Sequence, residues 1–235
     1  MDPARVSLLA DTARWLADPA HYRGTDAIPI RILEHVELSA LALAVACLIA
    51  LPIGLSLGHT GRFAFVVVNV ANVGRALPSL ALLAFALPLS FALGLGLGFW
   101  PTLIALVPLA IPPVLTNAYV AVRTVEPDVV EAARGMGFDG PGILRSVELP
   151  LALPLIWSGI RTGAVNIVAT ATLGALVAGG GLGRYIVDGL ALQEYDRLFA
   201  GALLVAALAI VVEVVFGTVE RRAASPGRRL EPAAL

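Results

Sequence analysis

Two long stretches without charge constrain this chain more than any other feature of its sequence. Residues 38–57 hold no charged side chain, and residues 63–122 hold a single one, Arg75. About 20 mainly apolar residues in a helix cross the hydrocarbon layer of a bilayer, which is ~30 Å thick. Only 14% of the 235 residues are charged, against about 25% in an ordinary soluble domain. We therefore expect an all-α integral membrane protein.

Prolines, glycines and charged residues divide the apolar sequence into five predicted spans. Pro88 and the Gly94-Leu-Gly-Leu-Gly98 run interrupt the long second stretch, so it is interpreted as two helices. Charged segments at 123–148 and 184–197 separate the later spans. The predicted spans cover residues 38–57, 63–88, 100–122, 149–177 and 198–219.

The segments outside this core are predicted to lie in water or on the membrane surface. Residues 1–34 mix charged and apolar side chains, unlike a signal peptide with its basic start and unbroken apolar segment. They are interpreted as an amphipathic surface segment ahead of a transmembrane core at 35–217. The arginines of the tail at 218–235 favour a cytoplasmic C-terminus. Five spans then place the 58–62 turn and the 123–148 loop on the cytoplasmic side as well.

The composition also excludes several classes of function. All 16 basic residues are arginine, so the chain lacks the lysine that a phosphate-binding P-loop or a Schiff-base enzyme needs. His21, His35 and His59 share no spacing typical of metal ligands, and the lone Cys47 cannot form an intramolecular disulfide. A net charge of −1 argues against nucleic acid as a partner. We expect no catalytic residues, no metal and no cofactor.

The charged loop between the third and fourth spans has a pattern of its own. Residues 129–136 are predicted to form a helix with a small apolar patch, Ala132 and Ala133, and Gly137 is predicted to end it. A second short amphipathic helix is expected at 142–147. A helical element that projects into water and has a small apolar face is expected to bind in a groove of another protein.

This loop resembles the EAA loop of permeases from binding-protein-dependent ABC importers of the type I, MetI-like class. That family has a Glu-Ala-Ala sequence, a glycine six positions after the glutamate, and a hydrophobic-x-Leu-Pro ending. The matching positions here are Glu131, Ala132, Ala133, Gly137, Val147, Leu149 and Pro150. The resemblance implies a cytoplasmic coupling helix that sits in a groove of a cytosolic ABC ATPase subunit, which binds the ATP. The chain would then be a transport subunit of the bacterial plasma (inner) membrane and not an enzyme.

Further segments resemble the osmoprotectant branch of this family, which carries glycine betaine, carnitine and choline. They are residues 75–83, 116–119, 159–162 and 170–183. The resemblance implies an importer supplied by an extracytoplasmic substrate-binding protein. The methionine branch of the family is also similar around Arg75 and in the glycine run at residues 178–183. A permease for methionine or an aliphatic sulfonate therefore remains an alternative. A stand-alone secondary transporter would be expected to show an inverted repeat, and we find none in the sequence.

Five spans are too few to enclose a pore comfortably, so we expect a route between two permease chains, identical or homologous. Polar groups inside spans are costly in lipid and are therefore candidates to line it, although they as often hydrogen-bond between helices. Tyr119 is singled out because quaternary ammonium groups favour aromatic faces, whereas Glu213 is expected to pair or to snorkel. The candidates are Asn72, Arg75, Asn117, Tyr119, Arg161, Asn166, Thr170 and Thr172.

Overall fold

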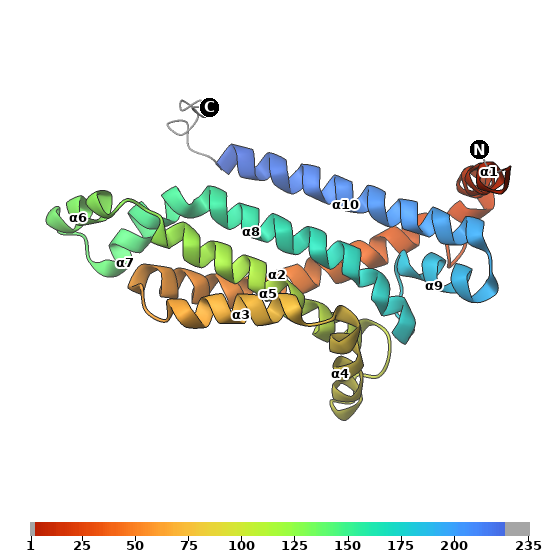
Figure 1. Ribbon diagram of the computed structural model, residues 1–235, viewed down its shortest axis with the longest axis horizontal. Coiled ribbons are helices and arrows are strands. Elements are labelled where there is room, and N and C mark those ends of the chain that lie inside the picture. Colours follow the sequence, from red (N-terminus) through yellow and green to blue (C-terminus); the bar gives the residue numbers. More distant parts are fainter. Residues whose placement is uncertain (1–2, 224–235) are drawn as a thin grey trace.

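The computed structural model describes residues 3–223, and the regular structure within that range is helical (Figure 1). For residues 3–7, 64, 68, 70–72, 75 and 223 it describes the backbone alone. Four helices in the described range are long and apolar enough to cross a membrane, which confirms the predicted all-helical membrane fold. They are α2 (Ile28–Thr60), α5 (Phe99–Arg123), the continuous helix Gly140–Val177 that contains α8 (Leu149–Thr170), and α10 (Tyr195–Ala223).

The core of the bundle forms among α2, α5 and α8, with α10 packed on the outside of α8 (Figure 1). Small buried residues recur every four positions along α2 and so lie on one face of it: Ala42, Ala46, Ala50, Gly54 and Gly58. This face allows a close approach to α5, because a Cβ added to Gly54 would lie only 2.8 Å from the Leu115 carbonyl oxygen. Small residues are the usual means of close helix packing in membranes.

The second predicted span, 63–88, is two helices in the structure. α3 (Ala64–Ala76) and α4 (Ser79–Ala92) are separated at Leu77, which has an extended backbone (φ −72°, ψ 120°). The reason is Pro78, which lacks an N–H and disfavours a helical conformation in the residue before it. At 1.5 Å per residue, α3 rises only ~20 Å, less than the hydrocarbon thickness. α4 then runs across the bundle axis (Figure 1), and Pro88 lies inside it.

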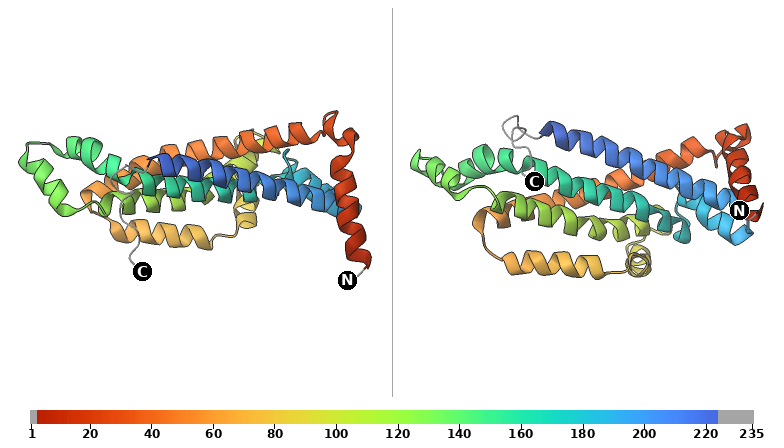
Figure 2. Two further views of the ribbon diagram at one scale, coloured as in Figure 1. Left: turned by 90° about the horizontal axis from the view of Figure 1, so that it is seen from above. Right: turned by 45° about the horizontal axis from the view of Figure 1, so that its top comes forward.

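The connections gather at two ends of the bundle (Figure 2). The end that we call the loop end holds the turn at residues 58–62, α6 (Pro127–Gly135), α7 (Gly140–Ile143) and the last turn of α10. The opposite end, the N-terminal end, holds α1 (Pro3–Ala17), η1 (Pro19–Tyr22), η3 (Ala171–Val177) and α9 (Gly183–Leu192). The turn, the loop and the end of α10 thus share one side, as the sequence predicts. Tail residues 224–235 lie outside the described residues.

Candidate functional site

A short helix and a tight reversal carry the predicted coupling residues at the loop end. α6 begins at Pro127, whose missing N–H is no loss in a first helical turn, and ends at Gly135. Gly137 follows with a φ of +90°, a backbone region that other residues rarely adopt. The Phe138 N–H then donates to the Ala133 carbonyl at 3.2 Å. The glycine predicted to end the helix is therefore the residue at which the chain turns back.

After this reversal the chain enters α8 as one continuous helix. The Asp139 carboxylate accepts a hydrogen bond from the Gly142 N–H at 2.8 Å and caps the start of α7. A π-helical turn, Leu144–Glu148, joins α7 to α8. Pro150 cannot donate to the carbonyl four residues before it, and the wider turn accommodates its ring. The short helix predicted at 142–147 is thus the beginning of the fourth spanning helix.

The tip of this element is exposed and partly apolar. Met136 is 72% exposed and Phe138 is 41% exposed. Among the predicted coupling residues, Ala133 is buried, Val147 and Leu149 are half-buried, and the exposed ones are Glu131, Ala132, Gly137 and Pro150. Exposed apolar side chains on a projecting element are typical of a surface that another protein covers.

The base of the element is fixed to the last turn of α2. His59 Nδ1 lies 2.5 Å from the Glu148 Oε2, and the Glu148 side chain is only 6% exposed. A buried carboxylate needs such a partner because it has lost its water. Ile143, 1% exposed, packs into the same base. A displacement of the loop would therefore reach α2 as well as α5 and α8.

A groove of about 350 Å³ opens between α3, α5 and α8, away from the loop. Two of the predicted path residues, Asn166 and Thr170, lie in it, and their four-residue spacing puts them on one face of α8. None of its described lining residues carries a charge. The lining residues are Gly74, Leu77, Leu109, Pro112, Pro113, Thr162, Asn166, Ala169 and Thr170.

The other predicted path residues have different surroundings. Asn117 packs where α5 meets Gly159 of α8, and its Nδ2 donates to the Pro113 carbonyl at 2.8 Å. Tyr119 is 9% exposed and belongs to the apolar core, so its ring is packed among core side chains. Thr172 donates to the Ala169 carbonyl at 2.9 Å. The side chains of Asn72 and Arg75 lie outside the described residues.

Arg161 lies on the opposite face of α8 from the groove and pairs with α10. Its Nη1 is 3.2 Å from Glu213 Oε1, and its Nε is 3.2 Å from Glu220 Oε2. Gly217, between the two carboxylates, leaves room for the guanidinium. Charges within a span are stable only when paired or hydrated, so this cluster ties α8 to α10. Pairing of Glu213 was expected from the sequence, but Glu220 was missed although its seven-residue spacing places it on the same helix face.

We expect an Arg161→Leu variant to unfold at a temperature several degrees lower in detergent. The substitution leaves two carboxylates without their cation next to apolar surroundings, which corresponds to about 2 kcal/mol. Differential scanning fluorimetry measures the shift. The matched control is the triple variant Arg161→Leu/Glu213→Gln/Glu220→Gln, which should recover most of it. Equal losses in both variants would show that the charges do not stabilise the pairing of α8 with α10.

The glycine run at residues 178–183 is held by the first turns of α2. Glu34 Oε2 accepts hydrogen bonds from the Gly181 N–H and from Arg31 Nη1, each at 2.8 Å. His35 Nε2 lies 2.9 Å from the Val168 carbonyl oxygen near the end of α8. A Cβ at Gly180 would collide with the Glu34 carboxylate. The glycine run is therefore closely packed against α2 in this structure.

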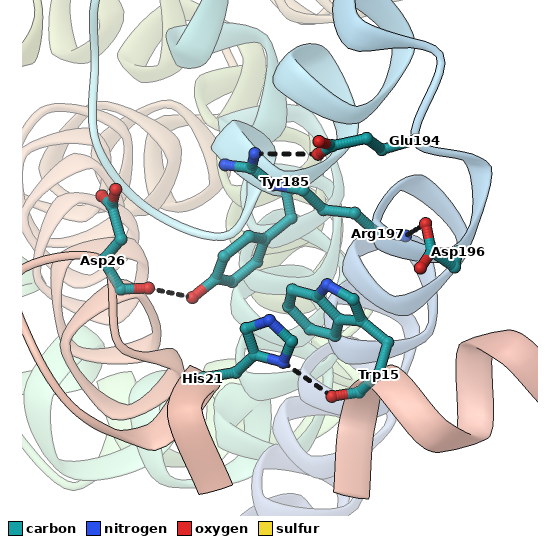
Figure 3. A pocket seen from close by; sticks show the side chains of 7 residues that line it. All are labelled: Trp15, His21, Asp26, Tyr185, Glu194, Asp196 and Arg197. Atoms are coloured by element: carbon teal, nitrogen blue, oxygen red, sulfur yellow. Dashed lines mark hydrogen bonds and ion pairs between the residues drawn. The ribbon is translucent and has the colours of Figure 1, made fainter. Parts of the chain in front are cut away.

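A second cavity, of about 440 Å³, lies at the N-terminal end, where the N-terminal segment meets α9 and α10 (Figure 3). The Trp15 ring stacks on His21 with 3.9 Å between centroids and meets the edge of Tyr185 at 5.2 Å. The Tyr185 hydroxyl donates to the Asp26 carbonyl, and burial raises the pKa of this phenol. Arg197 lies over the Tyr185 ring, 5.8 Å from its centroid. These contacts hold the segment before α2 against the α9–α10 hairpin.

Removal of the Tyr185 hydroxyl is expected to loosen this segment. Tyr185→Phe leaves the Asp26 carbonyl without its donor, a loss of about 1 kcal/mol. We expect faster amide hydrogen exchange in residues 19–27 and little change in the spanning helices. Tyr22→Phe is the control, because the Tyr22 hydroxyl also donates to a carbonyl, that of Leu16 at 2.9 Å, but on an exposed surface. Equal exchange in both variants would contradict the anchoring role.

Comparison with known families identifies the class of membrane protein to which this loop and helix bundle belong. The family described as "Binding-protein-dependent transport system inner membrane component" matches residues 50–225. The chain belongs to this family. The permease is therefore a multi-pass inner-membrane protein and a transport subunit, as predicted from the loop.

Relatives named for particular solutes cover most of this permease. The glycine betaine/carnitine/choline transport system permease protein OpuCB of Bacillus subtilis (strain 168) is 37% identical over 83% of this chain and 87% of its own length. The choline transport system permease protein OpuBB of the same organism is 38% identical over the same shares. The osmoprotectant import permease protein OsmW of Salmonella typhimurium is 32% identical over 86% of this chain and 92% of its own.

A solved structure shows the same fold. A chain of the MetNI methionine ABC transporter in an inward-facing conformation aligns with a TM-score of 0.74, over 84% of this permease and 96% of that chain. At 21% identity this similarity extends to the fold alone.

The groove residues on α5 were not predicted from the sequence. Pro112 and Pro113 lie in the groove wall, and neither has the polar side chain by which path residues are selected. A usable signal is present nevertheless, since adjacent prolines inside an apolar span are unfavourable for a helix and indicate a local role.

Proposed function

We propose that this permease is the membrane subunit of an ATP-driven importer for osmoprotectants such as glycine betaine, choline or carnitine. The main support is the identity of 32–38% over most of the chain to permeases named for those solutes. The described lining residues of the groove between α3, α5 and α8 carry no charge, which is consistent with weak, reversible binding of a zwitterionic or cationic solute. A charged lining would hold an oppositely charged solute too tightly for release.

In this proposal two permease chains, identical or homologous, enclose the route, and the groove is one wall of it. A cytosolic ABC ATPase receives the tip formed by Met136 and Phe138 together with the predicted coupling residues. The contact between Glu148 and His59 then transmits the movement of the ATPase to α2, α5 and α8. An extracytoplasmic binding protein delivers the solute. Asn166 and Thr170 are the path residues that we retain, because they line the groove.

Reconstitution tests this function directly. The permease would be placed in proteoliposomes with its ATPase and binding protein, and ATP hydrolysis and uptake would be measured with glycine betaine, choline, carnitine, methionine and an aliphatic sulfonate. We expect stimulation by at least one of the first three. Stimulation by methionine or the sulfonate alone would establish the alternative importer, and uptake without any ATPase would establish a secondary transporter.

A further inference from the structure

One backbone carbonyl in the middle of α5 lacks both of the N–H donors that a helical carbonyl ordinarily uses. A helical carbonyl accepts from the N–H four residues ahead, or three residues ahead in a tighter turn. For Leu109 these positions are Pro113 and Pro112, and proline has no N–H. Among residues 3–223, no described side chain and no backbone group of another element donates to this carbonyl.

This situation is particular to Leu109. Single prolines elsewhere in the spanning helices, such as Pro52 in α2 and Pro154 in α8, remove only the donor four residues ahead and leave the one three residues ahead. The pair at 112–113 is the only Pro-Pro in the sequence. The Leu109 carbonyl therefore cannot gain a donor even if the helix tightens locally to hydrogen bonds between residues three apart.

The residue that carries this carbonyl lies in the wall of the groove. A helical carbonyl points along the axis toward the residues three and four positions ahead, and Leu109, Pro112 and Pro113 all line the groove. Leu109 is near the middle of the 25-residue α5, where a bilayer offers no water. Backbone of this kind is tolerated at membrane depth only where it lines a cavity or contacts a partner.

The neighbours on α8 complete a neutral, acceptor-rich surface. The Asn166 side chain is exposed in the groove and makes no hydrogen bond within the described part of the chain. The Thr170 hydroxyl lies in the same groove. Carbonyl oxygens attract a cation through their dipoles without holding it as a carboxylate would, and this permits release.

We infer that the Leu109 carbonyl, exposed by Pro112 and Pro113, contacts the cationic ammonium end of the transported solute, with Asn166 beside it. The inference rests on the proposed import of osmoprotectants and adds the contact that selects them. The Pro-Pro pair acts as a positioning element. Because neither proline has an N–H, the Leu109 carbonyl oxygen stays available to the solute in the groove.

Restoring the donor tests this role. Pro113→Ala supplies an N–H to the Leu109 carbonyl and changes no charge. We expect uptake of radiolabelled glycine betaine by the reconstituted importer to fall about tenfold. Pro108→Ala is the matched control, since it supplies an N–H to Ile104, which does not line the groove; its uptake should stay within about twofold.

A second variant separates the carbonyl from the shape of the helix. Incorporation of lactic acid at position 113 removes the proline ring, as alanine does, but also removes the N–H. We expect this ester variant to recover most of the uptake that Pro113→Ala loses. Uptake as low as with Pro113→Ala, or wild-type uptake by Pro113→Ala, would overturn the role of the carbonyl. If the unsubstituted importer carries none of glycine betaine, choline and carnitine, the proposed function fails, and this inference fails with it.

Discussion

A Gly137→Val variant is expected to enter the membrane normally and to lose ATP-driven uptake by about tenfold or more. Gly137 has a φ of +90°, and a Cβ added there would meet no atom within 4 Å, so the effect is conformational and not a collision. A β-branched residue is strongly disfavoured at such a φ. The loop must relieve this strain by changing shape, which moves Met136 and Phe138 away from the positions they have in this structure. Uptake and co-purification of the ATPase measure the loss.

Gly135→Ala is the matched control for this prediction. Gly135 has equally open surroundings but a helical backbone, and alanine favours a helix there. We expect its uptake to equal that of the wild type. Normal uptake by Gly137→Val would refute the coupling role of the loop. A parallel loss in membrane insertion would instead place the defect in folding.

The second large effect is expected at the contact of α2 with α5. In a Gly54→Leu variant the new Cβ would lie 2.8 Å from both the Ala118 Cβ and the Leu115 carbonyl oxygen. A backbone oxygen cannot rotate away, so α2 must separate from α5 along the small-residue face. We expect destabilisation of about 3 kcal/mol or more, seen as loss of the monodisperse peak in detergent gel filtration and a lower unfolding temperature.

Ile53→Phe provides the comparison, because Ile53 is 46% exposed on the neighbouring face of the same helix. An added ring there projects into lipid or detergent and should change the unfolding temperature little. If Gly54→Leu were as stable as Ile53→Phe, the close α2–α5 contact would not be needed for the fold.

The local structure of the predicted coupling loop could be foreseen because its features are local. Gly137 fixes a turn through its own backbone, and Asp139 caps a helix three residues away. The resemblance of residues 131–150 to the EAA loop then added the expected partner. The contact between Glu148 and His59 could not be predicted in this way, since the two residues are far apart in the sequence and meet only when α2 and α8 pack.

The side chains that line the groove could be predicted only in part, because the polarity of a residue does not reveal in which direction it points. Asn117 and Asn166 are the same residue type in two predicted spans, yet one packs at a helix contact and the other lies in the groove. Tyr119 was selected for its aromatic ring, and the rotation of α5 places that ring in the core. The rotation of each helix about its axis decides such cases, and it depends on all neighbouring contacts together.

The sequence alone determined that this chain crosses a membrane as helices, where most of those helices end, and which loop has the pattern expected of the ATPase contact. These properties follow from apolar length, missing N–H groups and glycine conformations, which act over a few residues. Only the tertiary structure decided the direction of α4 after Pro78, the pairing of Arg161 with two carboxylates of α10, and the groove that both Leu109 and Asn166 line. These depend on how the helices rotate and approach one another, and that is fixed by side-chain packing across the whole bundle.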